Sequence, residues 1–156
     1  MVLDAELARF IASPVMIIIG TRDKHNRAAI ARGAGATVLK GSGMVEVIVS
    51  EWQWPDCIAN IHATGHIAAT FVRPSDYVAY QLKGRGTVRT AAEEDIRLSR
   101  RYVVDIVDTL GGLGVEPQLA APWIVNAEAA VIRLAVEDVY LQTPGPGAGA
   151  RLRGVA

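Results

Sequence analysis

Three basic residues in strand-like segments could bind a phosphate group. Lys83 and Arg85 stand two residues apart in an alternating stretch, and Arg32 lies in an earlier segment of the same type. Lysine and arginine bind phosphate through charge-assisted hydrogen bonds, which are stronger than hydrogen bonds between neutral groups. The alternative interpretation is that these side chains are ordinary solvent-facing residues of half-exposed strands. The residue types alone leave both interpretations open.

A metal site is not favoured. His62 and His66 have the spacing of a pair on one helix, but Gly65 stands between them and should end the helix. No glutamate follows His62, so the zinc-binding pattern HExxH is absent. We therefore expect no metal, and a surface or interface position for these histidines.

The single cysteine, Cys57, stands near a predicted helix start, where the pKa of a thiol is lowered. No histidine has a spacing that would activate it, so we expect a buried, unreactive thiol. One cysteine cannot form an intrachain disulfide, which favours a reducing compartment. The N-terminus is acidic and no apolar run is long enough to cross a bilayer. We expect a cytoplasmic protein that does not enter a membrane.

Charge argues against a nucleic-acid partner. Lys and Arg total 16, and so do Asp and Glu. A protein that holds a nucleic-acid backbone usually carries a basic excess, because it must replace condensed counterions. A local cluster of two or three cations could still bind a small phosphate.

Apolar patterning indicates a β-rich chain without βαβ alternation, which argues against a doubly wound sheet. The clearest strand covers residues 77–90, where alternation continues for more than ten residues. Gly84 and Gly86 in its middle suggest a bent barrel strand rather than a dinucleotide fingerprint, which needs a strand, then GxGxxG, then a helix. Further strands are predicted over 15–19, 27–38, 44–50, 66–72 and 123–141, the last as one strand or a bent pair. Helices are predicted from Asp4 to before Pro14, from Pro55 to Gly65, and over 92–110.

Three segments together suggest a known family. They are Gly-Thr-Arg-Asp at 20–23 with the following strand of Arg32, Ala-Thr-Phe-Val-Arg-Pro-Ser-Asp-Tyr at 69–77 with Gln-Leu-Lys-Gly at 81–84, and Gln-Thr-Pro-Gly-Pro-Gly-Ala-Gly at 142–149. Their arrangement resembles the pyridoxamine 5′-phosphate oxidase-like family, the FMN-binding split barrels, and in particular its short members. The resemblance implies a mainly β (β+α) fold, a six-stranded antiparallel split β-barrel with flanking helices, as one domain over residues 1–156. It also implies a homodimer with two equivalent sites at the interface.

The resemblance further implies an FMN-binding protein, a flavin-dependent oxidoreductase of unknown substrate. Arg32 and Lys83 are expected to contact the phosphate, with Ser50 and Gln53 assisting. Gln81 is expected to donate or accept a hydrogen bond near the flavin ring or the phosphate.

One segment departs from the family pattern. Glu-Trp-Gln-Trp at 51–54 stands where flavin-binding oxidases often carry a Ser-Arg-Lys-like stretch. Trp52 or Trp54 could instead stack on a ring system. The alternative function is a non-catalytic ligand-binding module of the same fold, which binds a deazaflavin, haem or no cofactor. Three tryptophans in so small a chain also favour a homodimer, because aromatic residues are enriched at interfaces.

Overall fold

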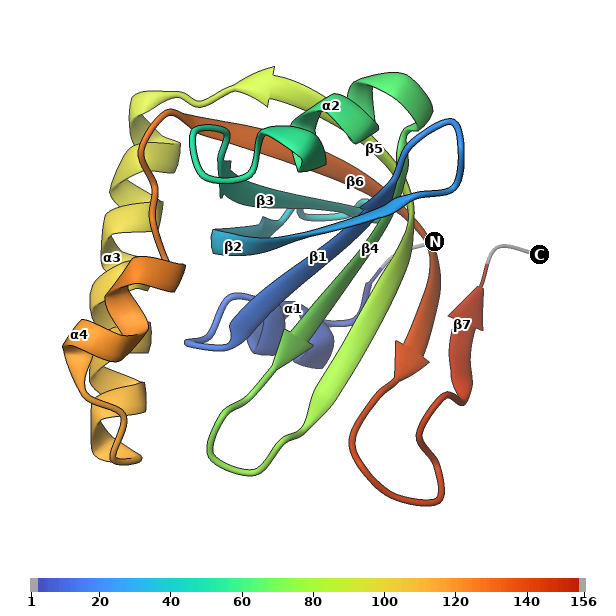
Figure 1. Cartoon of the computed structure of the whole chain (residues 1–156). Helices are drawn as coiled ribbons and strands as arrows, with labels where there is room; N and C mark the ends of the chain where they lie inside the picture. The colour runs from blue at the N-terminus through green and yellow to red at the C-terminus, as the bar shows by residue number, and fades with distance from the viewer. Residues whose placement is uncertain (1–2, 155–156) are drawn as a thin grey trace.

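The computed structural model describes residues 3–154 and consists of a β-barrel with helices packed around it (Figure 1). The outermost positions of the predicted domain, 1–2 and 155–156, lie outside the described residues. The strands are β1 (Met16–Arg22), β2 (Ala28–Val38), β3 (Met44–Ser50), β4 (His66–Val72), β5 (Ala79–Thr90), β6 (Ala129–Leu141) and β7 (Arg151–Gly154). The helices are α1 (Ala5–Ile11), α2 (Pro55–Thr64), α3 (Glu93–Gly112), α4 (Pro117–Ala120) and a 3₁₀ turn, η1 (Ala121–Trp123).

The strands form one antiparallel sheet in the order β3-β2-β1-β4-β5-β6-β7. An additional pairing of β3 with β6 closes six of these strands into a barrel. The expected six-stranded antiparallel barrel with flanking helices is therefore confirmed. The short strand β7, which pairs with the end of β6, was not predicted.

Alternation along each strand fills the barrel. On β1, Ile17 and Ile19 are buried whereas Ile18 between them is only half-buried. Phe71 on β4 and Leu82 on β5 are fully buried in the same core. The apolar run at 15–19 predicts a buried strand, but its outward positions stay partly open to solvent.

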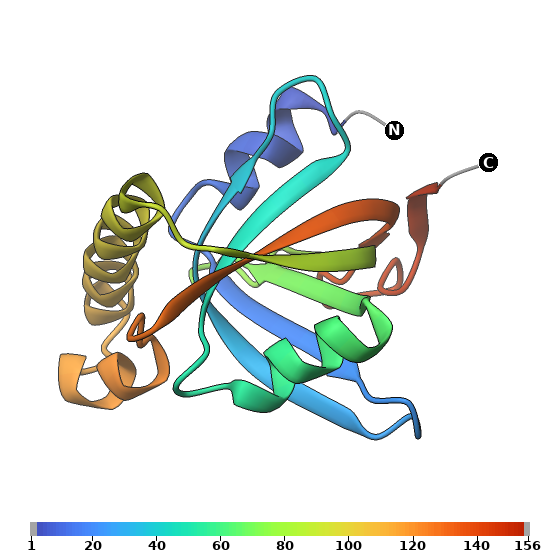
Figure 2. The ribbon, with the colours of Figure 1, turned by 90° about the horizontal axis from the view of Figure 1, so that it is seen from above.

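Helices close the barrel on three sides. Asp4 caps α1 by accepting a hydrogen bond from the Leu7 amide at 2.8 Å, and α1 buries Leu7 and Ile11 at one end of the barrel. Helix α2 lies at the opposite end, as the view from above shows (Figure 2). The long helix α3 packs against the outside of β2. Its Tyr102 hydroxyl also donates to the carbonyl of Val15, just before β1, at 2.6 Å. None of the helices within residues 3–154 is both long and apolar enough to cross a membrane.

Two features of the second half of the chain differ from the sequence prediction or refine it. The segment that begins at Trp123 is not a strand until Ala129, because Pro117 and Pro122 start short helical turns, a position that proline favours. The predicted bend of β5 is visible in Figure 1. The register between β5 and β6 shifts between Lys83 and Gly84, where β6 carries an extra residue, Glu137.

Candidate functional site

Five residues form a row across the outer face of the barrel. Arg32 on β2 pairs with Ile18 on β1, which pairs with Thr70 on β4. Thr70 pairs with Gln81 on β5, and Gln81 pairs with Tyr140 on β6. All five are partly exposed, so this row combines a guanidinium, a hydroxyl, an amide, a phenol and an aliphatic side chain on one surface.

A second row lies beside the first and adds a lysine and an exposed aliphatic residue. Lys83 on β5 is exposed, and its Nζ lies 4.6 Å from the centroid of the Tyr140 ring, a cation–π contact. Ile30 on β2 is 66% exposed. Within the first row, the Gln81 Nε2 donates to the Thr70 Oγ1 at 3.0 Å, which fixes the orientation of the amide.

The predicted site residues thus fall into two groups. Arg32, Gln81 and Lys83 share the outer face, whereas Ser50 and Gln53 lie where β3 leads into α2. Arg32 and Lys83 lie on strands three spacings apart, about 14 Å, and Lys83 lies one outward position further along the sheet. A ligand that touches both from one protomer must therefore lie across β1 and β4.

Ser50 has a structural role that the sequence did not reveal. Its side chain is fully buried, and its Oγ donates to the Ala127 carbonyl at 2.6 Å and accepts from the Gln53 amide at 3.2 Å. The Gln53 Nε2 donates to the Pro122 carbonyl at 2.8 Å. These bonds tie the 51–54 turn to the segment before β6, and they engage both hydrogen-bonding functions of the Ser50 hydroxyl.

The same turn contains the tryptophans that depart from the family pattern. Trp52 is 64% exposed and Trp123 on η1 is 56% exposed, whereas Trp54 packs against the core. The Trp54 Nε1 and the Gln53 Oε1 are buried and have no hydrogen-bond partner among residues 3–154.

A groove of about 400 Å³ runs along the outer face between β1, β4 and β5. It is lined in part by Arg22, His66, Lys83 and Glu137. The pKa of His66 is lowered, first by desolvation and then by the nearby charges of Arg22 and Arg85, against an opposing effect of Glu137. Of the nearby charges, those of the two arginines act on His66 more strongly than that of Glu137.

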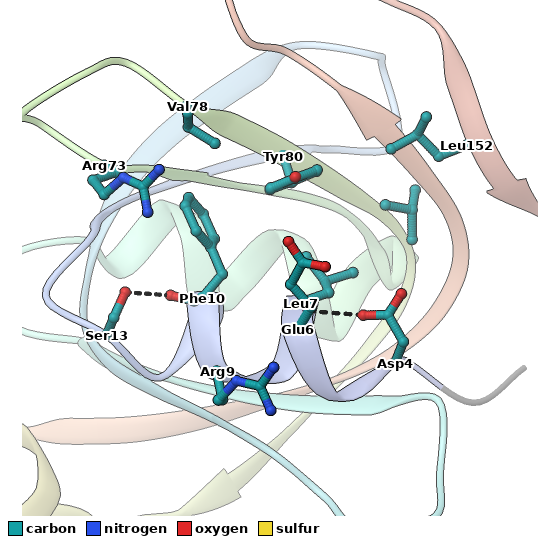
Figure 3. Close-up of a pocket in the computed structure, with 11 residues that line it drawn as sticks. Asp4, Glu6, Leu7, Arg9, Phe10, Ser13, Arg73, Val78, Tyr80 and Leu152 are labelled. Atoms are coloured by element: carbon teal, nitrogen blue, oxygen red, sulfur yellow. Dashed lines mark hydrogen bonds between the residues drawn. The ribbon is translucent and has the colours of Figure 1, made fainter.

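A larger cavity of about 600 Å³ lies between α1 and β5 (Figure 3). Phe10 and Tyr80 meet there edge to face, with ring centroids 5.1 Å apart. The Arg73 guanidinium lies 5.5 Å from the centroid of the Phe10 ring and forms an ion pair with Asp76 at 2.8 Å. None of the predicted site residues lines this cavity, and the charge of Arg73 is already compensated.

Cys57 is buried, as expected. It is 1% exposed, and burial raises the pKa of its thiol to about 11 despite its place in the first turn of α2. Desolvation outweighs the lowering by the side-chain hydrogen bond with Thr21, and the thiol is unreactive at neutral pH. Within residues 3–154, no group of three or more His, Cys, Asp or Glu side chains is arranged to hold a metal ion.

Comparison with known proteins identifies the fold. No protein-family model and no curated protein sequence matches the chain. Among solved structures, a provisionally assigned pyridoxamine 5′-phosphate oxidase from Lactobacillus delbrueckii is similar, with a TM-score of 0.55 and 14% identity over 89% of this chain and 93% of that one.

Two further solved structures, named for other ligands, are similar to the chain. An F420 reductase matches with a TM-score of 0.55 and 12% identity over 84% of this chain and 93% of that one. The haem storage protein HutZ from Vibrio cholerae matches with a TM-score of 0.53 and 10% identity over 90% of this chain and 95% of that one. The chain therefore has the split-barrel fold of the pyridoxamine 5′-phosphate oxidase-like proteins, as the resemblance of its sequence predicted.

Proposed function

We propose that the chain binds FMN on the outer face of the sheet and acts as a flavin-dependent oxidoreductase. The observation that supports this best is the placement of Arg32, Gln81 and Lys83 on adjacent rows of one partly exposed surface. Apolar Ile18 lies between the cations, where a planar ring can pack. The surface therefore offers both the charge for a phosphate and an apolar area for a ring.

The residues of the chain would position the cofactor rather than react. Lys83 would donate to the phosphate, and the Gln81 amide, held by Thr70, would present its carbonyl to a ring N–H. Arg32 would bind the far end of the ligand. The flavin supplies the hydride chemistry when bound, and the protein supplies binding and orientation.

We expect Lys83→Ala to weaken FMN binding by roughly one to two orders of magnitude, because a charge-assisted hydrogen bond contributes about 1.5–3 kcal/mol. The loss of the cation–π contact with Tyr140 should lower the free energy of unfolding by only about 0.5–1 kcal/mol. Quenching of flavin fluorescence on titration measures the affinity, and thermal unfolding measures the stability.

The matched control is Lys40→Ala, because Lys40 is an exposed lysine in the hairpin between β2 and β3. It should leave FMN affinity unchanged. Equal affinities of the Lys83 and Lys40 variants would remove Lys83 from the site. An absence of FMN binding to the wild-type protein would remove the flavin function.

The second candidate function is a module of the same fold that binds a deazaflavin or haem without catalysis. It is favoured by the acidic and aromatic turn at 51–54, and by the similarity to an F420 reductase and to a haem storage protein. Absorption spectra after separate addition of FMN, F420 and haem distinguish the candidates. An FMN-specific change supports the flavin function, and a Soret band shift supports the haem alternative.

We also propose a cytoplasmic homodimer in which two copies of the outer face meet. A stable interface of this kind buries roughly 2,000 Å². Exposed apolar Ile30 lies on this face and would be covered by the second copy. The buried, unpaired thiol of Cys57 agrees with a reducing compartment.

Ile30→Glu should raise the dimer dissociation constant at least about 100-fold, because it would bury an unpaired carboxylate on each side of the interface. Val104→Glu is the matched control, since Val104 on α3 is 67% exposed, close to the 66% of Ile30. Light scattering over a dilution series measures the dimer. Dissociation by the Val104 variant alone would place the interface on α3 instead.

A further inference from the structure

Two arginines and a histidine form a row of their own at one end of the outer face. His66 on β4 pairs with Arg85 on β5. Arg22 on β1 is the next outward position beyond the Thr21–Ile67 pair, which places it beside His66. The three residues are separated by 44 and 19 positions in the sequence (22 to 66 and 66 to 85), so only the order of the strands brings them together.

Uncharged partners position the three permanent cations of this region, Arg22, Lys83 and Arg85, without neutralising their charge. The Arg22 Nη1 donates to the Asn26 side chain, and the Arg85 Nη1 donates to the Thr64 carbonyl at 2.9 Å. Lys83 contacts the Tyr140 ring. In the part of the chain that the structure describes, Arg22, Lys83 and Arg85 form no ion pair with a carboxylate.

Two carboxylates lie beside the cluster, Glu137 and Asp138, and Asp138, opposite Lys83, forms an ion pair with Arg151. Glu137, the extra residue of the β6 bulge, lines the groove and acts on His66 against the two arginines. Arg22, Lys83 and Arg85 carry three permanent positive charges against Glu137 and Asp138. Because Arg151 compensates the charge of Asp138, the groove keeps a net positive potential. Fixed donors around a concave surface of this sign are what a phosphate group requires.

We propose that Arg22, His66, Lys83 and Arg85 form a phosphate-binding groove on the outer face of β1, β4 and β5. This inference deepens the proposed function and rests on it for the flavin as the ligand, whereas the binding of a phosphate group rests on the groove alone. It places the phosphate of the flavin at the Arg22–His66–Arg85 row. The ring is then left for the Ile18 row, which lies beyond the row of Lys83, and Arg32 lies at the ring end rather than at the phosphate.

Phosphate binding in this groove is coupled to the protonation of His66. The charged groups that face the imidazole are Arg22 on β1, Lys83 and Arg85 on β5, and Glu137 on β6. A bound dianion offsets the cations, so it raises the pKa of His66. By reciprocity, the protonated imidazole strengthens binding, and phosphate affinity falls as the pH rises through the titration of His66.

The test uses inorganic phosphate as the probe and follows the imidazole resonances by NMR. His66 is assigned by the resonance missing from His66→Asn, and ionic strength is matched with sodium chloride. Saturating phosphate should raise the pKa of His66 by about one unit in the wild-type protein. Arg85→Gln should abolish most of this shift while keeping a donor for the Thr64 carbonyl. Arg100→Gln, at an exposed arginine of α3, should leave the shift intact.

Comparison of FMN with riboflavin separates this inference from the proposed function. Riboflavin lacks the phosphate, so FMN should bind the wild-type protein at least tenfold more tightly, about 1.4 kcal/mol, and Arg85→Gln should remove that difference. Equal binding of FMN and riboflavin to the wild-type protein would overturn the placement of the flavin phosphate while the flavin function stands. A phosphate-induced shift of His66 without any flavin binding would leave the groove and overturn the flavin function. No response of His66 to phosphate would overturn the groove itself.

Discussion

Replacement of Gly84 by alanine is expected to destabilise the barrel by at least about 4 kcal/mol, among the largest effects of a single substitution. A Cβ at this position would overlap the carbonyl oxygen of Ala135 and lie 3.1 Å from the backbone nitrogen of Glu137. Both atoms belong to the backbone of β6, so no side-chain rotation relieves the clash. Because domains are stable by about 5–15 kcal/mol, much of the variant should be unfolded. Urea unfolding followed by circular dichroism measures the loss.

Gly111→Ala is the matched control. Gly111 lies in the last turns of α3, and a Cβ there would meet no atom within 4 Å. Alanine in a helix is favoured over glycine by about 0.5–1 kcal/mol, so this variant should be slightly more stable than the wild-type protein. Wild-type stability of the Gly84 variant would show that β5 and β6 do not approach each other this closely.

Local signals in the sequence predict most strands at or near their observed bounds. Residues 44–50 and 66–72 are strands over the predicted ranges, because glycines at 41, 43 and 65 mark the turns beside them. The glycines within 77–90 correctly predict a bend. Which strand would bulge depends on the register between β5 and β6, and that register is not encoded in either strand alone.

Elements determined by distant partners were missed. The four residues of β7 have no periodicity long enough to detect, and they become a strand by pairing with the end of β6. Likewise, alternation predicts that Lys83 and Arg85 point outward, but only the order β1-β4-β5 adds Arg22 and His66 beside them. The sequence therefore predicts that the site contains basic side chains, but it identifies only some of the residues that form it.

A charge network on the other side of the barrel should dominate the acid stability of the protein. The Glu46 carboxylate is 6% exposed and accepts hydrogen bonds from Arg89 at 2.7 and 2.9 Å. Arg133 donates to the same carboxylate at 2.7 and 2.9 Å. Arg89 also binds Asp95, which accepts from the Ala92 amide at 2.7 Å and so begins α3. The network joins β3, β5, β6 and α3.

We expect Glu46→Gln to lower the free energy of unfolding by about 2–3 kcal/mol at neutral pH. Removal of one partner of a buried pair costs about 3–5 kcal/mol, but Arg89 and Arg133 are partly exposed, and water can solvate them after the change. Glu94→Gln is the matched control, because Glu94 is an exposed glutamate in the first turn of α3. It should change stability by less than about 0.5 kcal/mol.

Glu46→Gln should also make the free energy of unfolding depend less steeply on pH in acid. Hydrogen bonds from Arg89 are the largest cause of the lowered pKa values of both Glu46 and Asp95, whose ordinary values are 4.5 and 3.8. A carboxylate with a lowered pKa in the folded state stabilises fully above its unfolded pKa, and this contribution disappears as the pH falls through the folded pKa. The wild-type protein should therefore lose stability steeply as the pH falls below about 4.5. Asp23 and Asp76 also have lowered pKa values but lie outside this network and are present in both proteins, so the difference reports on Glu46 and the network that it shares with Asp95. Melting temperatures measured across the acid range should converge for wild type and Glu46→Gln, and a constant gap between them would show that the charge of Glu46 does not stabilise the fold.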